Sequence, residues 1–158
     1  MVFLACFFIM FLSLTLTGCE DLPEELDDFL DPTPNYITVT VIARARAIYQ
    51  STDDNGITVT SPNDGVVVHI KIQKAGGENS VWDKNTDSNG YTETVTATFD
   101  VYKEQPVEVK ALPQGFEADR YGSKVFTWNE IWHLAGEEFG KSITVTAYDV
   151  VIITEFTR

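Results

Sequence analysis

Residues 36–49 read YITVTVIARARAIY, and this stretch decides the fold of the chain. Apolar side chains occupy every odd position from Ile37 to Ala47, and Thr or Arg fills most even positions. Successive side chains of a strand point to opposite faces, whereas a helix would place its apolar residues three or four apart. The period of two therefore predicts a long β-strand with one buried face.

Further strands are predicted along the rest of the chain. They cover residues 57–60, 66–72, 91–101, 107–111, 123–128 and 141–154, with Asp, Asn, Gly and Pro clusters between several of them. We expect Thr92, Thr94, Thr96 and Thr98 on a solvated face and Trp128 in the core. About seven short strands with frequent turns predict an all-β fold, a single antiparallel Greek-key β-sandwich.

Two details of the pattern lie near the C-terminal end. Residues 129–135 are predicted as one or two helical turns, with Asn129 as the N-cap and Gly136 ending the helix. After Asp149 the run Val-Val-Ile-Ile at 150–153 breaks the alternation. This break indicates either a β-bulge or a strand covered on both faces.

Composition and charge limit the classes of protein to which this chain can belong. A length of 158 residues fits one domain, and 44% hydrophobic residues exclude a disordered chain. The 24 acidic residues exceed the 11 basic ones and give a formal net charge of -13. Such a chain repels phosphate backbones, so we expect no nucleic-acid partner.

The N-terminal segment is uncharged from Val2 to Leu16. As a helix it spans only ~22 Å, less than the ~30 Å hydrocarbon core, so it suits the apolar region of a secretory signal. The next residues are Leu16-Thr17-Gly18-Cys19. This sequence resembles the lipobox of bacterial lipoproteins, although no Lys or Arg precedes the apolar run.

The lipobox resemblance implies a processing route. Residues 1–18 form a signal peptide that is removed, and Cys19 carries a diacylglyceryl group, often with a further acyl chain. The protein is then anchored in a cell membrane or outer envelope by lipid and faces the extracytoplasmic side. The alternative is an ordinary signal or short anchor in which Cys19 has no role. Because Cys6 leaves with the signal, no disulfide is expected.

Residues 19–35 are predicted to be a tether and residues 36–158 the folded domain. The stretch 20–31 holds seven acids and no base, so -13 minus these seven leaves -6 for residues 32–158. Like charges repel and extend a chain, which makes this segment a spacer.

The segment 66–111 contains Thr86-Asp87-Ser88-Asn89-Gly90-Tyr91 between apolar strands. It is similar to carboxypeptidase-regulatory-like and transthyretin-like Greek-key domains, and a generic immunoglobulin-like domain reads nearly the same. The resemblance implies a non-catalytic module.

Oxygen-bearing side chains at Asn85, Asp87 and Asn89 resemble the opening of a calcium loop, with Gly90 in the sixth, glycine position, and Asp83 could add an oxygen to a site of another kind. Thr96 stands where a bidentate Glu is needed, so we favour the alternative that these residues form a turn. Glu93 is a further candidate oxygen donor.

The sequence gives weaker evidence for catalytic and partner-binding residues than for the signal and the strands. His69 and His133 are the two histidines, and no metal or nucleophile motif surrounds them, so we expect neither an enzyme nor a cofactor. Trp132 and Trp82 are candidate partner-binding residues, unless they fill the core.

The sequence thus predicts a non-enzymatic binding or structural module at the cell envelope, with an envelope protein or glycan as its partner. The alternative is a carbohydrate- or calcium-binding accessory component of an envelope enzyme or transport system.

Overall fold

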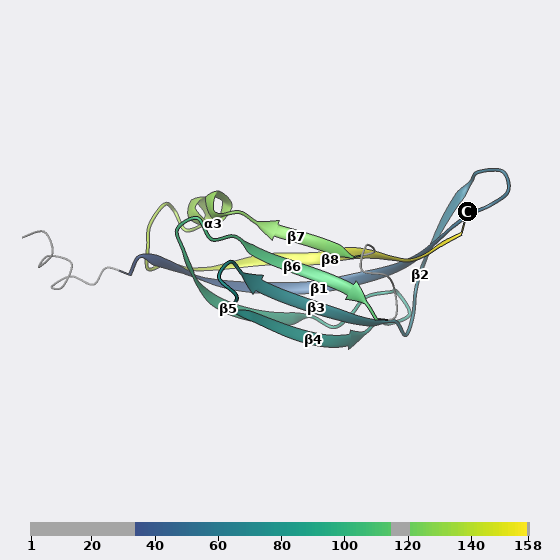
Figure 1. Ribbon diagram of the computed structural model, residues 1–158, viewed down its shortest axis with the longest axis horizontal. Helices are drawn as coiled ribbons and strands as arrows, with labels where there is room; N and C mark the ends of the chain where they lie inside the picture. The colour runs from purple at the N-terminus through teal and green to yellow at the C-terminus, as the bar shows by residue number, and fades with distance from the viewer. Residues whose placement is uncertain (1–33, 115–120, 158) are drawn as a thin grey trace, which may run out of the picture. The chain divides into compact units, whose positions relative to one another are not determined.

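A computed structural model describes residues 34–114 and 121–157 and shows two sheets whose apolar faces pack together (Figure 1). The first sheet holds β1 (Tyr36–Thr52), β2 (Thr58–Pro62), β5 (Val95–Tyr102) and β8 (Ser142–Thr157). The second has the order β4 (Asn79–Asn85), β3 (Val67–Lys74), β6 (Val107–Pro113) and β7 (Gly122–Phe126). The prediction of an all-β, sandwich-like fold is confirmed.

Strand β1 organises the first sheet. It pairs with β5 through residues 36–43 and with β2 through residues 48–52, both in antiparallel register. In the interval between them, the Thr92 N–H donates to the Ala45 carbonyl at 3.0 Å and the Ala47 N–H donates to the Gly90 carbonyl at 2.8 Å. The backbone of β1 therefore stays hydrogen bonded where β5 and β2 do not reach it.

The first and last strands, β1 and β8, run parallel, which corrects the expectation of a purely antiparallel sandwich (Figure 1). The Gly140 N–H donates to the Tyr36 carbonyl, and the Thr38 N–H donates to the Lys141 carbonyl at 2.9 Å. The chain thus enters β8 beside the start of β1. Because it arrives there from β7 through the helix α3, it passes from the second sheet to the first and runs in the direction of β1.

Strand β4 is the one element that the sequence pattern missed. Its sequence is NSVWDKN, in which Val81 and Trp82 are adjacent and no apolar alternation exists. It is an edge strand that pairs only with β3 among the described residues. The side chains of this edge strand are half-buried or exposed, so its sequence lacks the apolar alternation that marks buried strands.

The core follows the predicted alternation closely. The inward residues of β1, β3, β5 and β6 are fully or almost fully buried, and they include Ile37, Val41, Ile70, Phe99 and Val109. The alternation predicts Thr92 on a solvated face, and this is wrong, because Thr92 is only 4% exposed. Its hydroxyl accepts a hydrogen bond from the Ala45 N–H at 3.1 Å, which compensates its burial.

The break in alternation after Asp149 is a β-bulge. The β1–β8 register shifts between Ala43 and Ala45, where Arg44 of β1 stands opposite two residues of β8, Tyr148 and Asp149, and Asp149 has φ +58°. Beyond the bulge Val150 and Ile152 are buried while Val151 is exposed, so the strand is not covered on both faces.

The predicted helix exists as α3 (Trp128–Leu134), but its cap is Thr127 and not Asn129. The Thr127 hydroxyl accepts from the Glu130 N–H, and the Glu130 carboxylate accepts from the Thr127 N–H at 2.8 Å, which is a capping box. Trp128 therefore begins a helix instead of ending a strand. Gly136 follows the helix at φ +72°, in agreement with its predicted role. None of the described helices is sufficiently long and apolar to span a bilayer.

Candidate functional site

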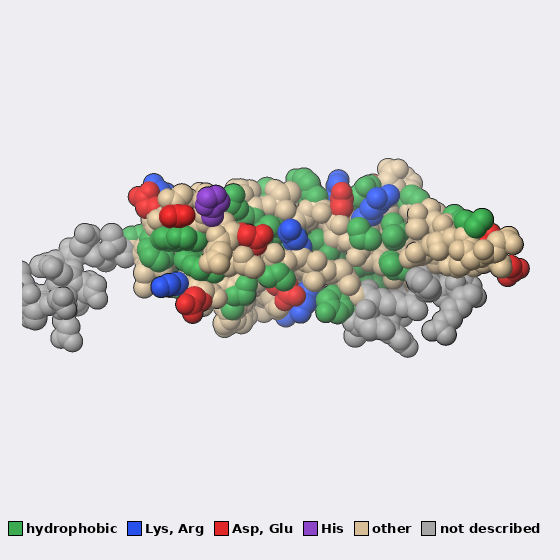
Figure 2. All heavy atoms as spheres, turned by 90° about the horizontal axis from the view of Figure 1, so that it is seen from above, with side chains coloured by type: hydrophobic (Ala, Val, Ile, Leu, Met, Phe, Trp, Pro, Cys, Tyr) green, Lys and Arg blue, Asp and Glu red, His purple; other side chains and the backbone are tan. Residues whose placement is uncertain are grey.

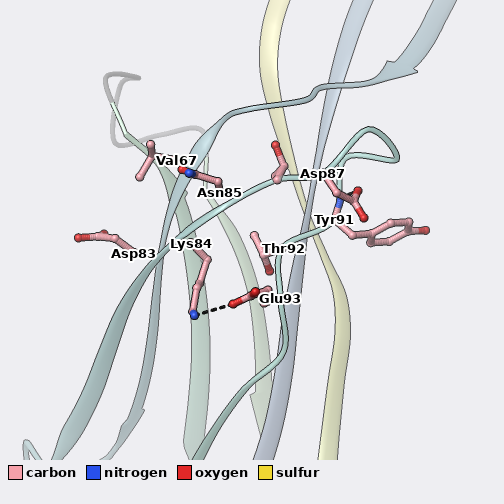
Figure 3. A pocket seen from close by; sticks show the side chains of 9 residues that line it. Val67, Asp83, Lys84, Asn85, Asp87, Tyr91, Thr92 and Glu93 are labelled. Carbon is pink, nitrogen blue, oxygen red and sulfur yellow. Dashed lines mark hydrogen bonds and ion pairs between the residues drawn. The ribbon is translucent and has the colours of Figure 1, made fainter.

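A polar groove of about 550 Å³ lies between the end of β4 and the segment that leads into β5 (Figure 3). It gathers three of the four candidate calcium ligands and Glu93. The lining residues are Val67, Asp83, Lys84, Asn85, Thr86, Asp87, Tyr91, Thr92 and Glu93.

The floor of the groove consists of threonines with structural roles. The Thr86 hydroxyl donates to the Asn63 carbonyl at 2.7 Å and accepts from the Val66 N–H at 3.0 Å. Thr86 and Thr92 are both buried and face each other in a β-bridge. The Thr86 hydroxyl joins the turn before β3 to the connection before β5, and the Thr92 hydroxyl joins that connection to β1, so both hold the groove's shape rather than offer free ligands.

One ion pair spans the groove. The Lys84 ammonium lies 2.8 Å from the Glu93 carboxylate and joins β4 to the facing segment (Figure 3). The Lys84 hydrogen bond and charge lower the pKa of Glu93, which keeps this exposed carboxylate ionised. A cation that approached Glu93 would first meet the lysine, so the pair opposes metal binding here.

Asp87 is used within its own turn. Its Oδ1 accepts hydrogen bonds from the Asn89 and Tyr91 N–H groups, each at 2.9 Å. The residues described include no group of three or more His, Cys, Asp or Glu side chains arranged to hold a metal ion. The geometry of Asp87 favours the turn interpretation of residues 87–90 over the calcium loop.

Asp83 points away from the groove (Figure 3) and pairs with His69 across β3 and β4. The His69 Nδ1 and the Asp83 Oδ1 are 2.8 Å apart on the open face of the sheet. In the described segments no Ser, Thr or Cys side chain is hydrogen bonded to His69, so the pair lacks the nucleophile that a triad requires. His133 lies elsewhere, exposed on α3.

Tyr91 does not present its ring to the groove. The ring points away from it (Figure 3), and the Arg44 and Arg46 guanidinium carbons lie 4.3 and 5.0 Å from the ring centroid. Arg44 also pairs with Asp149 at 2.8 Å. This cation–π stack supports the outer face of β1 and β8 beside the bulge, and it leaves the groove without an aromatic platform.

The tryptophans singled out as partner-binding residues both pack against the core. Trp132 is half-buried, and its ring lies 5.6 Å from that of Trp128 and 4.8 Å from that of Phe139. Trp82 is half-buried on the inward side of β4. Packing thus explains much of the surface of both side chains, and a partner would reach only their exposed parts.

A second pocket, of about 300 Å³, lies on the open face of the second sheet and is lined by His69, Lys71, Lys110, Leu112 and Tyr121. His69 and Lys71 alternate along β3 with the buried Val68, Ile70 and Ile72, so they lie on the open face. Lys110 and Tyr121 come next to them only through the pairing of β3 with β6 and of β6 with β7.

Surface charge is mixed on the face drawn in Figure 2, where acidic, basic and hydrophobic side chains alternate without a continuous field of one sign. Cys19, the predicted lipidation site, lies outside the described residues, together with the rest of residues 1–33.

No protein-family model matches this chain, and no curated protein matches it either.

Proposed function

We propose that this protein is a lipid-anchored extracytoplasmic lipoprotein that displays a non-enzymatic β-sandwich module at the cell envelope. The observation that carries the proposal is the sequence Leu16-Thr17-Gly18-Cys19 directly after an uncharged apolar run. A leader too short to span the bilayer as a helix, followed by this motif, is what a lipoprotein signal requires.

The chemistry of the anchor explains how an acidic chain stays at a membrane. With a net charge of -13, the protein gains no attraction from anionic headgroups. Acyl chains contribute ~0.8 kcal/mol per buried CH₂, and the two or three chains of a lipoprotein hold it where a single chain would not. The seven acids of residues 20–31 then act as an extended spacer between lipid and domain.

The assignment as a Greek-key module of the carboxypeptidase-regulatory-like or transthyretin-like type is part of this proposal. It is supported by the tight turn at residues 87–90, which follows β4 and leads into β5. A non-enzymatic role is supported by the use of Asp87 and Glu93 in a turn and an ion pair.

The test replaces the thiol that the lipid needs. The Cys19→Ser protein is expected to lose the diacylglyceryl mass and to be either released from membranes or retained uncleaved. Cys6→Ser, in the same leader, is the matched control and should be lipidated and retained like the unchanged protein. Intact-mass spectrometry of the membrane fraction measures the lipid mass and the cleavage site. A Cys19→Ser product that is cleaved before residue 19 and still firmly membrane-bound would contradict the anchor.

A carbohydrate-binding accessory role is the second candidate. It is favoured by the polar groove, which is lined by the exposed Asn85 amide, a hydrogen-bond donor and acceptor. Neutral sugars are bound by such acceptors and donors, and binding at the groove would be lost in Asn85→Ala while the fold stays intact.

A further inference from the structure

The second pocket joins two lysines that the fold places directly opposite each other. Lys71 of β3 and Lys110 of β6 are register partners, and both line the pocket. Like charges in this position destabilise a sheet, so the pair does not serve the stability of the strands. A negative group bound between the two ammonium ions would relieve their repulsion.

The described residues supply only part of that negative charge. The Lys110 ammonium lies 3.2 Å from the Glu108 carboxylate, which also accepts a hydrogen bond from the Gln73 amide at 2.8 Å. Lys71 forms no ion pair with a described carboxylate. Of the two lysines, Lys71 is therefore the one whose charge a bound anion would neutralise.

Of the other lining residues, His69 pairs with Asp83, and Leu112 and Tyr121 offer apolar surface. Leu112 is half-buried, Tyr121 is 50% exposed, and the Lys110 ammonium lies 5.8 Å from the centroid of the tyrosine ring. A volume of about 300 Å³ accommodates one small ring. An aromatic face beside two cations suits a ligand that carries an apolar ring face and a charged edge.

We propose that this pocket binds a carboxylate carried on a six-membered ring. The carboxylate lies between Lys71 and Lys110, and the ring packs on Tyr121 and Leu112. Two sources share this chemistry, a sugar acid and an aromatic acid. The inference stands apart from the lipid anchor, since it depends only on β3, β6 and Tyr121.

The test is a titration of the ¹⁵N-labelled full chain in a non-ionic detergent, followed by its amide chemical shifts. The probes are sodium glucuronate, sodium benzoate and uncharged glucose, at constant ionic strength. Saturable shifts at residues 69–71, 110–112 and 121 are expected with at least one of the two acids and not with glucose. The acid with the lower Kd identifies the source.

Two double variants separate a local site from overall charge. Lys71→Gln/Lys110→Gln is expected to raise the Kd at least tenfold. Lys103→Gln/Lys141→Gln removes the same charge from exposed positions outside the pocket, and its Kd should stay within about twofold of the unchanged protein. Equal weakening in both variants, equal shifts with glucose, or no shift with either acid would overturn the proposal.

Discussion

Single side chains show how one local motif is used twice. Asp53-Asp54-Asn55-Gly56 and Asp87-Ser88-Asn89-Gly90 have the same pattern, and in each the aspartate Oδ1 accepts two backbone N–H groups. The Ile57 N–H is the main reason that the pKa of Asp53 is lowered. Short-range chemistry of this kind is readable from sequence, because donor and acceptor lie within four residues of each other.

The surroundings of the two turns differ, and this leads to a prediction. Gly56 has open space around it, whereas a Cβ on Gly90 would lie 2.4 Å from the Ala47 carbonyl oxygen. Gly56→Ala should cost about 1–2 kcal/mol of unfolding free energy, from its positive φ alone. Gly90→Ala should cost at least ~3 kcal/mol, because the hydrogen bond to the Ala47 N–H must also shift. Urea unfolding measures the free energy of both variants. An equal loss of stability in the two would contradict the close approach of Gly90 to Ala47.

Among the elements, α3 depends on its cap more than on its length. It has seven residues, fewer than an isolated helix needs, and one buried residue, Ile131. The pKa of Glu130 is lowered, chiefly by the hydrogen bond from the Thr127 N–H and then by that from the Thr127 hydroxyl. The capping contribution of this carboxylate is therefore present above the ordinary Glu pKa and is lost as pH falls through the lowered value.

Thr127→Ala tests the cap. It should destabilise the domain by about 1 kcal/mol, since one orphan N–H loses its acceptor. It should also raise the Glu130 pKa toward its ordinary value without restoring it fully, because the backbone bond remains. Urea unfolding and a carboxyl-carbon NMR titration measure these effects. Thr94→Ala, at an exposed position, is the control and should change stability by less than ~0.5 kcal/mol. An unchanged Glu130 titration in Thr127→Ala would argue against the capping box.

For the domain as a whole, the close approach of its two sheets at one side depends on Gly122. A Cβ at this first residue of β7 would lie 2.4 Å from the Val151 carbonyl oxygen and 2.9 Å from Val150 Cγ1, beside the bulge of β8. The smallest residue therefore stands where a strand of one sheet meets a strand of the other.

Gly122→Ala should lower the free energy of unfolding by about 2–3 kcal/mol, because the added methyl group pushes β7 from β8. Ser123→Ala, the next residue and exposed, should lower it by less than ~0.5 kcal/mol. Chemical unfolding of both variants provides the measurement. If the two variants are equally stable, then β7 and β8 do not approach as closely as described.

The sequence by itself determined the strands that bury one face, the turns, the break in alternation after Asp149 and the candidate acids of the groove. Each of these features depends on residues close together in the sequence, either through an alternation of apolar and polar side chains or through residues that favour turns. The tertiary structure alone decided the edge strand β4, the parallel pairing of β1 with β8 and the burial of Thr92. It also decided that Lys71 meets Lys110, since residues 39 positions apart become neighbours only through strand register. Pairing between distant strands depends on the packing of the whole core, and no local pattern encodes it.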